Sequence, residues 1–90
     1  MMEVVRMVLV GKERFLNKEK NGYWHKVHYI MEFTNAKVEA GCVGSFGKDV
    51  FVSEEAWLSI KNDDIGREFV FEYGSNQFGN PMVIGLRFAE

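Results

Sequence analysis

The sequence predicts an all-β domain that takes up the whole chain, residues 1–90. Apolar and polar residues alternate with a period of two through most segments, which is the pattern of half-buried strands. Turn-forming stretches rich in Gly, Asn and Ser separate these segments. With 47% hydrophobic and 14% aromatic residues, the chain can also build the one small core that a domain of this length needs.

The first half of the chain predicts four strands and one charged connection. Asn21-Gly22 is a tight-turn signal at the end of that connection. In the strand that follows, Val27 and Tyr29 share one face, whereas Trp24 and Lys26 share the other. The expected elements are residues 3–10 (strand), 11–22 (charged loop or ribbon), 23–33 (strand), 34–35 (turn), 36–43 (strand), 44–47 (loop) and 49–52 (strand).

The second half predicts one helix and two final strands. Ser53 followed by Glu54 and Glu55 is a helix start, with a serine cap and acids in the first turn. The helix is expected to run to about Asn62, and Trp57 is expected in the core. Strands are predicted over residues 67–73 and 81–88, joined by a turn over 74–80. The residues expected to face one way on the last strand are Met82, Ile84, Leu86 and Phe88.

Five or six short strands with one helix placed late predict a small barrel. A closed or nearly closed barrel leaves no long sheet edge exposed to other chains. The OB-fold is a barrel of this kind, and oligonucleotides are common ligands for it. We therefore expect a single OB-like domain of five or six strands with one short helix.

Charge is distributed unevenly along the chain, although the net charge is only −2. Residues 11–28 hold five Lys or Arg and two Glu, a net charge of +3. Residues 49–72 hold two Lys or Arg and seven Asp or Glu, a net charge of −5. Such polarity can orient an anionic ligand on one surface.

Aromatic residues next to cations on expected loops and turns are the main functional signal. A ring on a polar loop is poorly solvated until a partner covers it. Single-stranded nucleic acid is such a partner, because its bases stack on rings and its phosphates meet cations. The candidate nucleic-acid-binding residues are Tyr23, Trp24, Lys26, Phe46 and Phe78, with Arg14, Lys18 and Lys20, and also Lys12, as phosphate contacts.

The segment Gln77-Phe78-Gly79-Asn80-Pro81 and the apolar run up to Leu86-Arg87-Phe88 resemble a known hairpin. It is similar to the C-terminal hairpin of the filamentous-phage single-stranded DNA-binding (helix-destabilising) proteins. The layout of most of the chain resembles that family, whereas the motif covers about a dozen residues. The chain differs from the family at Gly85, where the family pattern has an arginine, and in its acidic net charge.

The resemblance implies an OB-like homodimer that coats single-stranded DNA without strong sequence preference, in phage or mobile-element replication. Phe78 matches the family's aromatic at the turn tip. Either Tyr23 or Trp24 matches the aromatic that follows the glycine of the DNA-binding ribbon. Phe46 falls where the family has an exposed tyrosine between two strands.

Other classes of function find less support in the sequence. No catalytic spacing appears, His25 and His28 point to opposite faces of a strand, and Cys42 is the single cysteine, so we expect no enzyme, metal or cofactor. No apolar run approaches 18 residues, so we expect no membrane span. The single cysteine cannot form an internal disulfide, which fits a reducing compartment, so we expect a cytoplasmic protein. The alternative function is a protein–protein interaction module whose exposed rings anchor a protein partner. DNA is expected before RNA, which is also bound by stacking.

Overall fold

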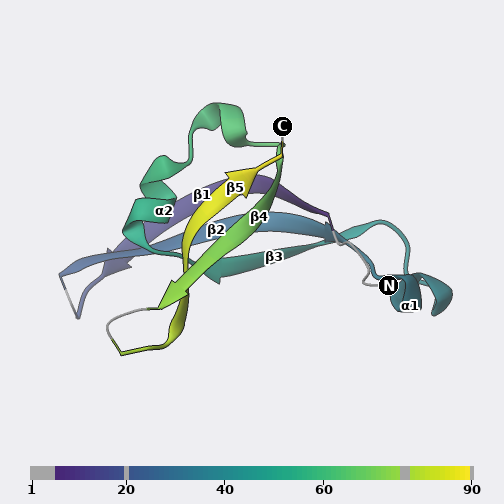
Figure 1. The fold of residues 1–90 in the computed structure, drawn as a ribbon, viewed down its shortest axis with the longest axis horizontal. Coiled ribbons are helices and arrows are strands. Elements are labelled where there is room, and N and C mark those ends of the chain that lie inside the picture. The colour runs from purple at the N-terminus through teal and green to yellow at the C-terminus, as the bar shows by residue number, and fades with distance from the viewer. Residues whose placement is uncertain (1–5, 20, 76–77, 90) are drawn as a thin grey trace.

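The computed structural model describes residues 6–19, 21–75 and 78–89. Five strands form one antiparallel sheet in the order β3-β2-β1-β4-β5 (Figure 1). The elements are β1 (Met7–Asn17), β2 (Gly22–Glu32), α1 (Asn35–Glu39), β3 (Ser45–Phe51), α2 (Glu54–Ser59), the 3-10 turn η1 (Asn62–Asp64), β4 (Glu68–Ser75) and β5 (Pro81–Phe88). The all-β prediction is confirmed, but in the described residues the sheet is not closed into a barrel.

β1 and β2 form a long hairpin that takes in most of the segment predicted as a charged loop or ribbon. Residues 11–17 pair one by one with residues 22–28, so the segment stays in the sheet. Asn21 has the left-handed conformation, with φ of 56°, that the tight-turn signal predicted. The register shifts between Leu9 and Gly11, which leaves Val10 without a partner on β2.

Residues 36–43 do not form the predicted strand, because Asn35–Glu39 is the helix α1. The Lys37 backbone N–H donates to the Thr34 hydroxyl at 3.4 Å, which caps the first turn. Gly41, with φ of 104°, follows the helix in a conformation that glycine adopts readily. No residue of α1 is buried. The alternation of small apolar residues that suggested a strand therefore has no sheet to pack on.

The third strand starts earlier than its sequence pattern predicted. β3 begins at Ser45, so the predicted loop over 44–47 is mostly strand, and Phe46 pairs with Met31 of β2. β3 is an edge strand, because among the described strands only β2 pairs with it.

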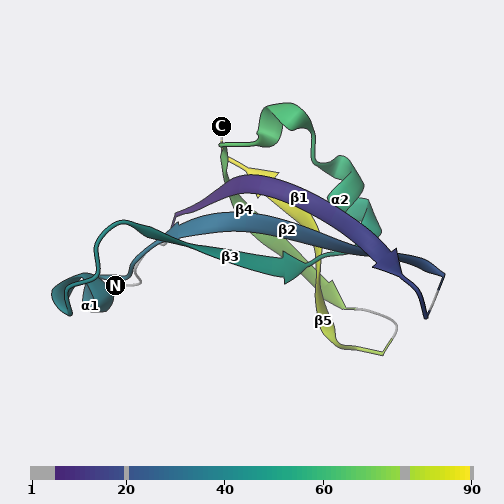
Figure 2. The same cartoon turned by 180° about the vertical axis from the view of Figure 1, so that it is seen from behind.

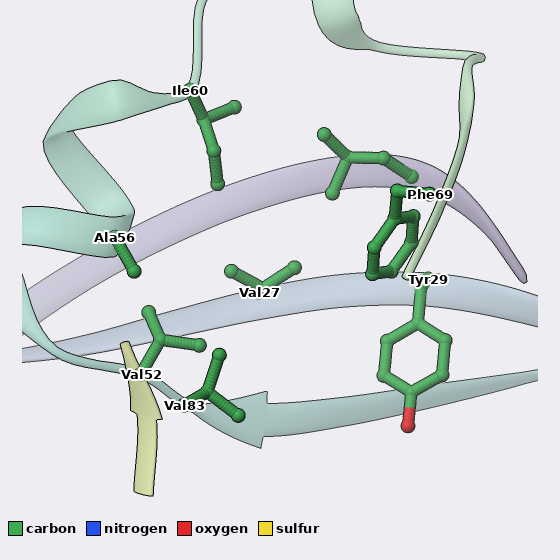
Figure 3. Packing of buried hydrophobic residues seen from close by; sticks show 8 residues of the cluster. Val27, Tyr29, Val52, Ala56, Ile60, Phe69 and Val83 are labelled. Atoms are coloured by element: carbon green, nitrogen blue, oxygen red, sulfur yellow. The ribbon is translucent and has the colours of Figure 1, made fainter. Parts of the chain in front are cut away.

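The core lies between the sheet and α2. We call the sheet face that carries Val27 and Tyr29 the inner face, and the opposite face the outer face. Ala56 and Ile60 point toward Val27 across this space (Figure 3). Trp57, which was expected in the core, is half-buried and packs against the buried hydrophobic residues. The buried hydrophobic residues are Leu9, Val27, Tyr29, Val52, Ala56, Ile60, Phe69 and Val83.

The start of α2 is capped as predicted, since the Ala56 backbone N–H donates to the Ser53 hydroxyl at 3.1 Å. Replacing Ser53 with alanine should lower the free energy of unfolding by about 1 kcal/mol, because one N–H of the first turn loses its acceptor. Urea unfolding followed by circular dichroism measures this. Ser75→Ala, at an exposed position at the end of β4 with no helix to cap, is the matched control. Equal stabilities of the two variants would contradict the role of the cap.

β5 changes face part-way along its length, which corrects the prediction of one shared face. Glu72 pairs with Gly85 and Tyr73 pairs with Val83, so Ile84 has no partner across the ladder. Val83 is therefore buried, whereas Ile84 is 47% exposed. Past the end of β3, Val52 forms a parallel bridge with Val83, and the Ser53 N–H donates to the Val83 carbonyl at 3.0 Å.

A buried carboxylate closes η1. Asp64 accepts a hydrogen bond from the Lys61 backbone N–H at 2.9 Å and from the Arg67 guanidinium at 3.0 Å. These bonds, the Lys61 N–H first, hold the pKa of the Asp64 carboxyl below its usual range. The tight turn brings Asp64 back onto the backbone of Lys61, so its carboxylate is not a freely solvated charge.

Candidate nucleic-acid interface

Three aromatic rings gather on the outer face, at the end of the sheet formed by β1, β2 and β3. Phe15 and Trp24 are directly opposite each other on β1 and β2. The Phe51 ring from β3 lies 5.3 Å from the Trp24 ring and 6.4 Å from the Phe15 ring, measured between centroids. We call Phe15, Trp24 and Phe51 the aromatic platform.

The platform is open to solvent. Phe15 is 40% exposed, Trp24 41% and Phe51 52%. Three large rings on one sheet face, outside the buried core, form an apolar surface of the kind that marks a binding site. Flat rings at this spacing can stack on the bases of a single strand.

Lys26 supplies the cation of the platform. It pairs with Phe51 across the β2–β3 ladder, and its ammonium lies 5.0 Å from the Phe51 ring and 5.7 Å from the Phe15 ring. The Lys26 ammonium also lies 3.8 Å from the Asp49 carboxylate. A phosphate that approaches the platform therefore meets a cation already held over the rings, in competition with Asp49.

A hydrogen-bonded pair lies further along the same face. His28 Nε2 and Glu13 Oε1 are 2.6 Å apart. His28 is on the same face as Trp24 and Lys26, as the alternation along the strand predicted.

Tyr23 lies on the inner face, away from the platform. The Arg14 guanidinium lies 4.7 Å from the Tyr23 ring and 5.3 Å from the Trp57 ring. The alternatives Tyr23 and Trp24 thus project to opposite sides of the same hairpin, and only Trp24 joins other exposed rings.

The cations predicted to contact phosphate differ in the interactions that they already make within the protein. The Lys12 ammonium donates to the Trp57 carbonyl at 2.9 Å and to the Ile60 carbonyl at 2.8 Å, so it is used inside the protein. Arg14 and Lys18 are exposed. Lys20 lies outside the described residues.

The two remaining aromatic candidates, Phe78 and Phe46, are not part of the platform. Phe78 follows β4 in the turn before β5 and is 76% exposed. The ends of the β1–β2 and β4–β5 hairpins extend toward the same end of the long axis, opposite α1 (Figures 1 and 2). Phe46 is on β3 and stacks on Phe33, with 5.1 Å between ring centroids.

Phe15 and Phe51 are not among the residues that the sequence predicts to bind nucleic acid. Phe15 lies in the segment predicted as a charged loop or ribbon, and Phe51 lies in a short predicted strand whose neighbours the sequence does not show. The signal that identifies them is the alternation of faces along paired strands, because Phe15 lies opposite Trp24 once residues 11–17 are paired with β2.

Comparison with known proteins gives no match: no protein-family model, no curated protein and no solved structure matches the chain. The resemblance of residues 77–88 to phage single-stranded DNA-binding proteins therefore stays a prediction. In the part of the chain that the structure describes, no helix has the length and hydrophobicity needed to cross a bilayer. Within these residues, no group of three or more His, Cys, Asp and Glu is placed so that it could hold a metal ion.

Proposed function

We propose that this protein binds single-stranded DNA with little sequence preference, in the replication of a phage or mobile element in the cytoplasm. The observation that carries the proposal is the aromatic platform, with Lys26 held over two of its three rings. Every base presents a face that can stack on a ring, so this mode of binding tolerates any sequence. It requires no chemical step and no cofactor.

We further propose that the sheet is an OB-like barrel that is only partly closed. Three features support this: the strand order, the helix between β3 and β4, and the parallel bridge from Val52 to Val83. The bridge joins the end of β3 to the opposite edge strand, which is where a barrel would close. In such barrels the exposed strand faces and adjoining loops bind oligonucleotides.

The net charge of −2 does not prevent binding, because the β1–β2 hairpin that carries Phe15 and Trp24 is locally rich in cations. Lys26 is on the platform and Lys18 is next to the hairpin, whereas Arg14 lies on the inner face of the hairpin. The acidic residues of α2 and η1 lie in the other part of the sequence, residues 49–72, which has a net charge of −5. Attraction over these distances is screened by salt, which gives the proposal a measurable signature.

Binding of a labelled oligo(dT) should weaken steeply between about 20 mM and about 300 mM salt, since phosphate contacts release counterions. The slope of log K against log salt should be about −0.7 for each phosphate contacted. Fluorescence anisotropy measures it, and an oligo(rU) of equal length tests the preference for DNA. If neither oligonucleotide binds at the lower salt, the proposal fails. The exposed rings are then anchors for a protein partner, the alternative function.

We also propose that the protein is a homodimer. Its accessible surface is 6899 Å², against about 5,400 Å² for a compact 10.4 kDa monomer. Its radius of gyration is 14.9 Å, against about 12 Å for a compact domain of this length. The excess area is enough for one protomer's share of a stable interface, about 800 Å². Exposed apolar residues such as Val70, Tyr73 and Ile84 are available for it.

Light scattering at micromolar concentration should therefore give twice the mass of the 10.4 kDa chain. The mass should fall toward that of one chain on dilution, as it does for a reversible dimer. A single-chain mass at every concentration would contradict the dimer and leave the DNA-binding proposal to its own test.

A further inference from the structure

A second aromatic site lies at the opposite end of β3 from the platform. Phe33, Thr34, Lys37 and Phe46 line a groove, which we call the Phe33–Phe46 groove. The two rings are stacked at 27° with centroids 5.1 Å apart, and Phe46 is still 37% exposed. The surface of the groove is mostly apolar, and Lys37 is the one charged residue among the described residues that line it. A ring pair with a neighbouring ammonium suits a ligand that carries a flat base and an anionic group.

The cations near this groove are available to an anion. Among the described residues, neither Lys37 nor Lys48 forms an ion pair, whereas Lys26 pairs with Asp49 and Arg6 with Glu32 and Glu68. Lys48 is exposed and lies on β3 between Phe46 and Phe51. The nearby acid Glu32 is engaged by Arg6 at 3.8 Å.

β3 connects the two aromatic sites. Phe51 is at one end of the strand and Phe46 five positions earlier, about 17 Å along an extended chain. Within the described sheet, the outer edge of β3 has no pairing strand. The two rings are on opposite faces, since Phe46 pairs with Met31 and Phe51 with Lys26. A ligand that joins both sites must therefore pass around this open edge, beside Lys48.

We propose that the Phe33–Phe46 groove is a second nucleotide-binding site for the strand that lies on the platform, with Lys48 contacting phosphate between them. This inference rests on the proposed function, because the platform must bind the same strand. It defines the path of the strand, along the edge of β3 and from the outer to the inner face. A path of this length fits within the site size of about 4–16 nucleotides that such folds occupy.

The test compares a short and a long oligonucleotide, about 4 and about 12 nucleotides of dT, by anisotropy at low salt. Phe46→Ala should weaken binding of the long strand by about 5-fold or more, the effect of losing one stacked base. The short strand covers the platform alone and should bind Phe46→Ala as it binds the unaltered protein. Phe46→Trp keeps a ring and should keep the affinity for the long strand.

Lys37→Gln and Lys48→Gln should each reduce the salt slope for the long strand and leave it unchanged for the short strand. Lys37→Gln keeps the backbone N–H that Thr34 caps, so α1 should stay folded. Glu39→Gln, on the same helix but outside the groove, is the matched control and should not weaken binding.

Two results would overturn the inference while leaving the proposed function intact. In one, Trp24→Ala weakens both oligonucleotides but Phe46→Ala weakens neither. In the other, Phe46→Ala converts a dimer to a monomer in light scattering at unchanged affinity per chain, which shows that a second copy covers the groove. Absence of binding to either oligonucleotide by the unaltered protein would instead remove the proposed function itself.

Discussion

Replacing Trp24 with alanine should weaken the binding of oligo(dT) by about 5- to 150-fold, the loss expected for one stacked base. Trp24 is the ring of the platform that contacts Phe51 and lies opposite Phe15. Because it is 41% exposed and outside the core, its removal should change the melting temperature little. Anisotropy of a labelled oligonucleotide measures the affinity without needing tryptophan fluorescence.

Two further variants make this test specific to the face of the hairpin. Trp24→Phe keeps a ring and should recover most of the affinity. Tyr23→Ala is the matched control, because Tyr23 is the next residue on the same strand but projects to the inner face, against Arg14. If Tyr23→Ala weakened binding more than Trp24→Ala, the binding surface would be the inner face, and the platform would not be the site.

Replacing Lys12 with methionine should lower the free energy of unfolding by about 2 kcal/mol. The Lys12 ammonium donates to two carbonyls at the end of α2, those of Trp57 and Ile60, and lies 3.9 Å from the centre of the Trp57 ring. Methionine keeps the length of the apolar stem but leaves both half-buried carbonyls without this donor. The melting temperature should fall by roughly 10 °C for a domain of this size.

Lys18→Met removes the same charge from an exposed position near the turn of the hairpin and serves as the control. It should leave the melting temperature nearly unchanged. Equal melting temperatures for the two variants would show that the Lys12 hydrogen bonds contribute nothing to holding α2 on the sheet.

The sequence predicted those elements whose pattern is decided locally. The Ser53 cap needs only the residues that follow it, and the strand Gly22–Glu32 needs only alternation and the turn at Asn21. The final two strands also match prediction closely, because Pro81 and the surrounding turn residues mark their limits.

The errors have one physical origin, which is that alternation does not show what a strand pairs with. Apolar and polar residues alternate over residues 36–43, yet no neighbouring strand of the described sheet pairs with them. The chain instead forms α1, which Thr34 caps. Ile84 and Leu86 are two positions apart, so alternation predicts one shared face for them. The register shift after Glu72 instead leaves Ile84 outside the core.

The candidate site was predicted in part, for the same reason. Trp24 and Lys26 were assigned correctly to one face, because that assignment depends on a single strand. The contributions of Phe15 and Phe51 depend on the register between three strands, which no single segment contains.

The junction between β1 and β4 determines how this chain can fold. Among the described residues, the ladder between these strands holds two residue pairs, Met7 with Phe69 and Val8 with Glu68, and the partners are about 60 residues apart in sequence. Each hairpin can form from neighbouring residues, whereas this junction requires most of the chain to be brought together first. The strand pairings thus divide into two sets that are local in sequence, β1–β2–β3 and β4–β5, which meet at this junction, through α2 and at the Val52–Val83 bridge. We expect the formation of these long-range contacts to set the rate of folding.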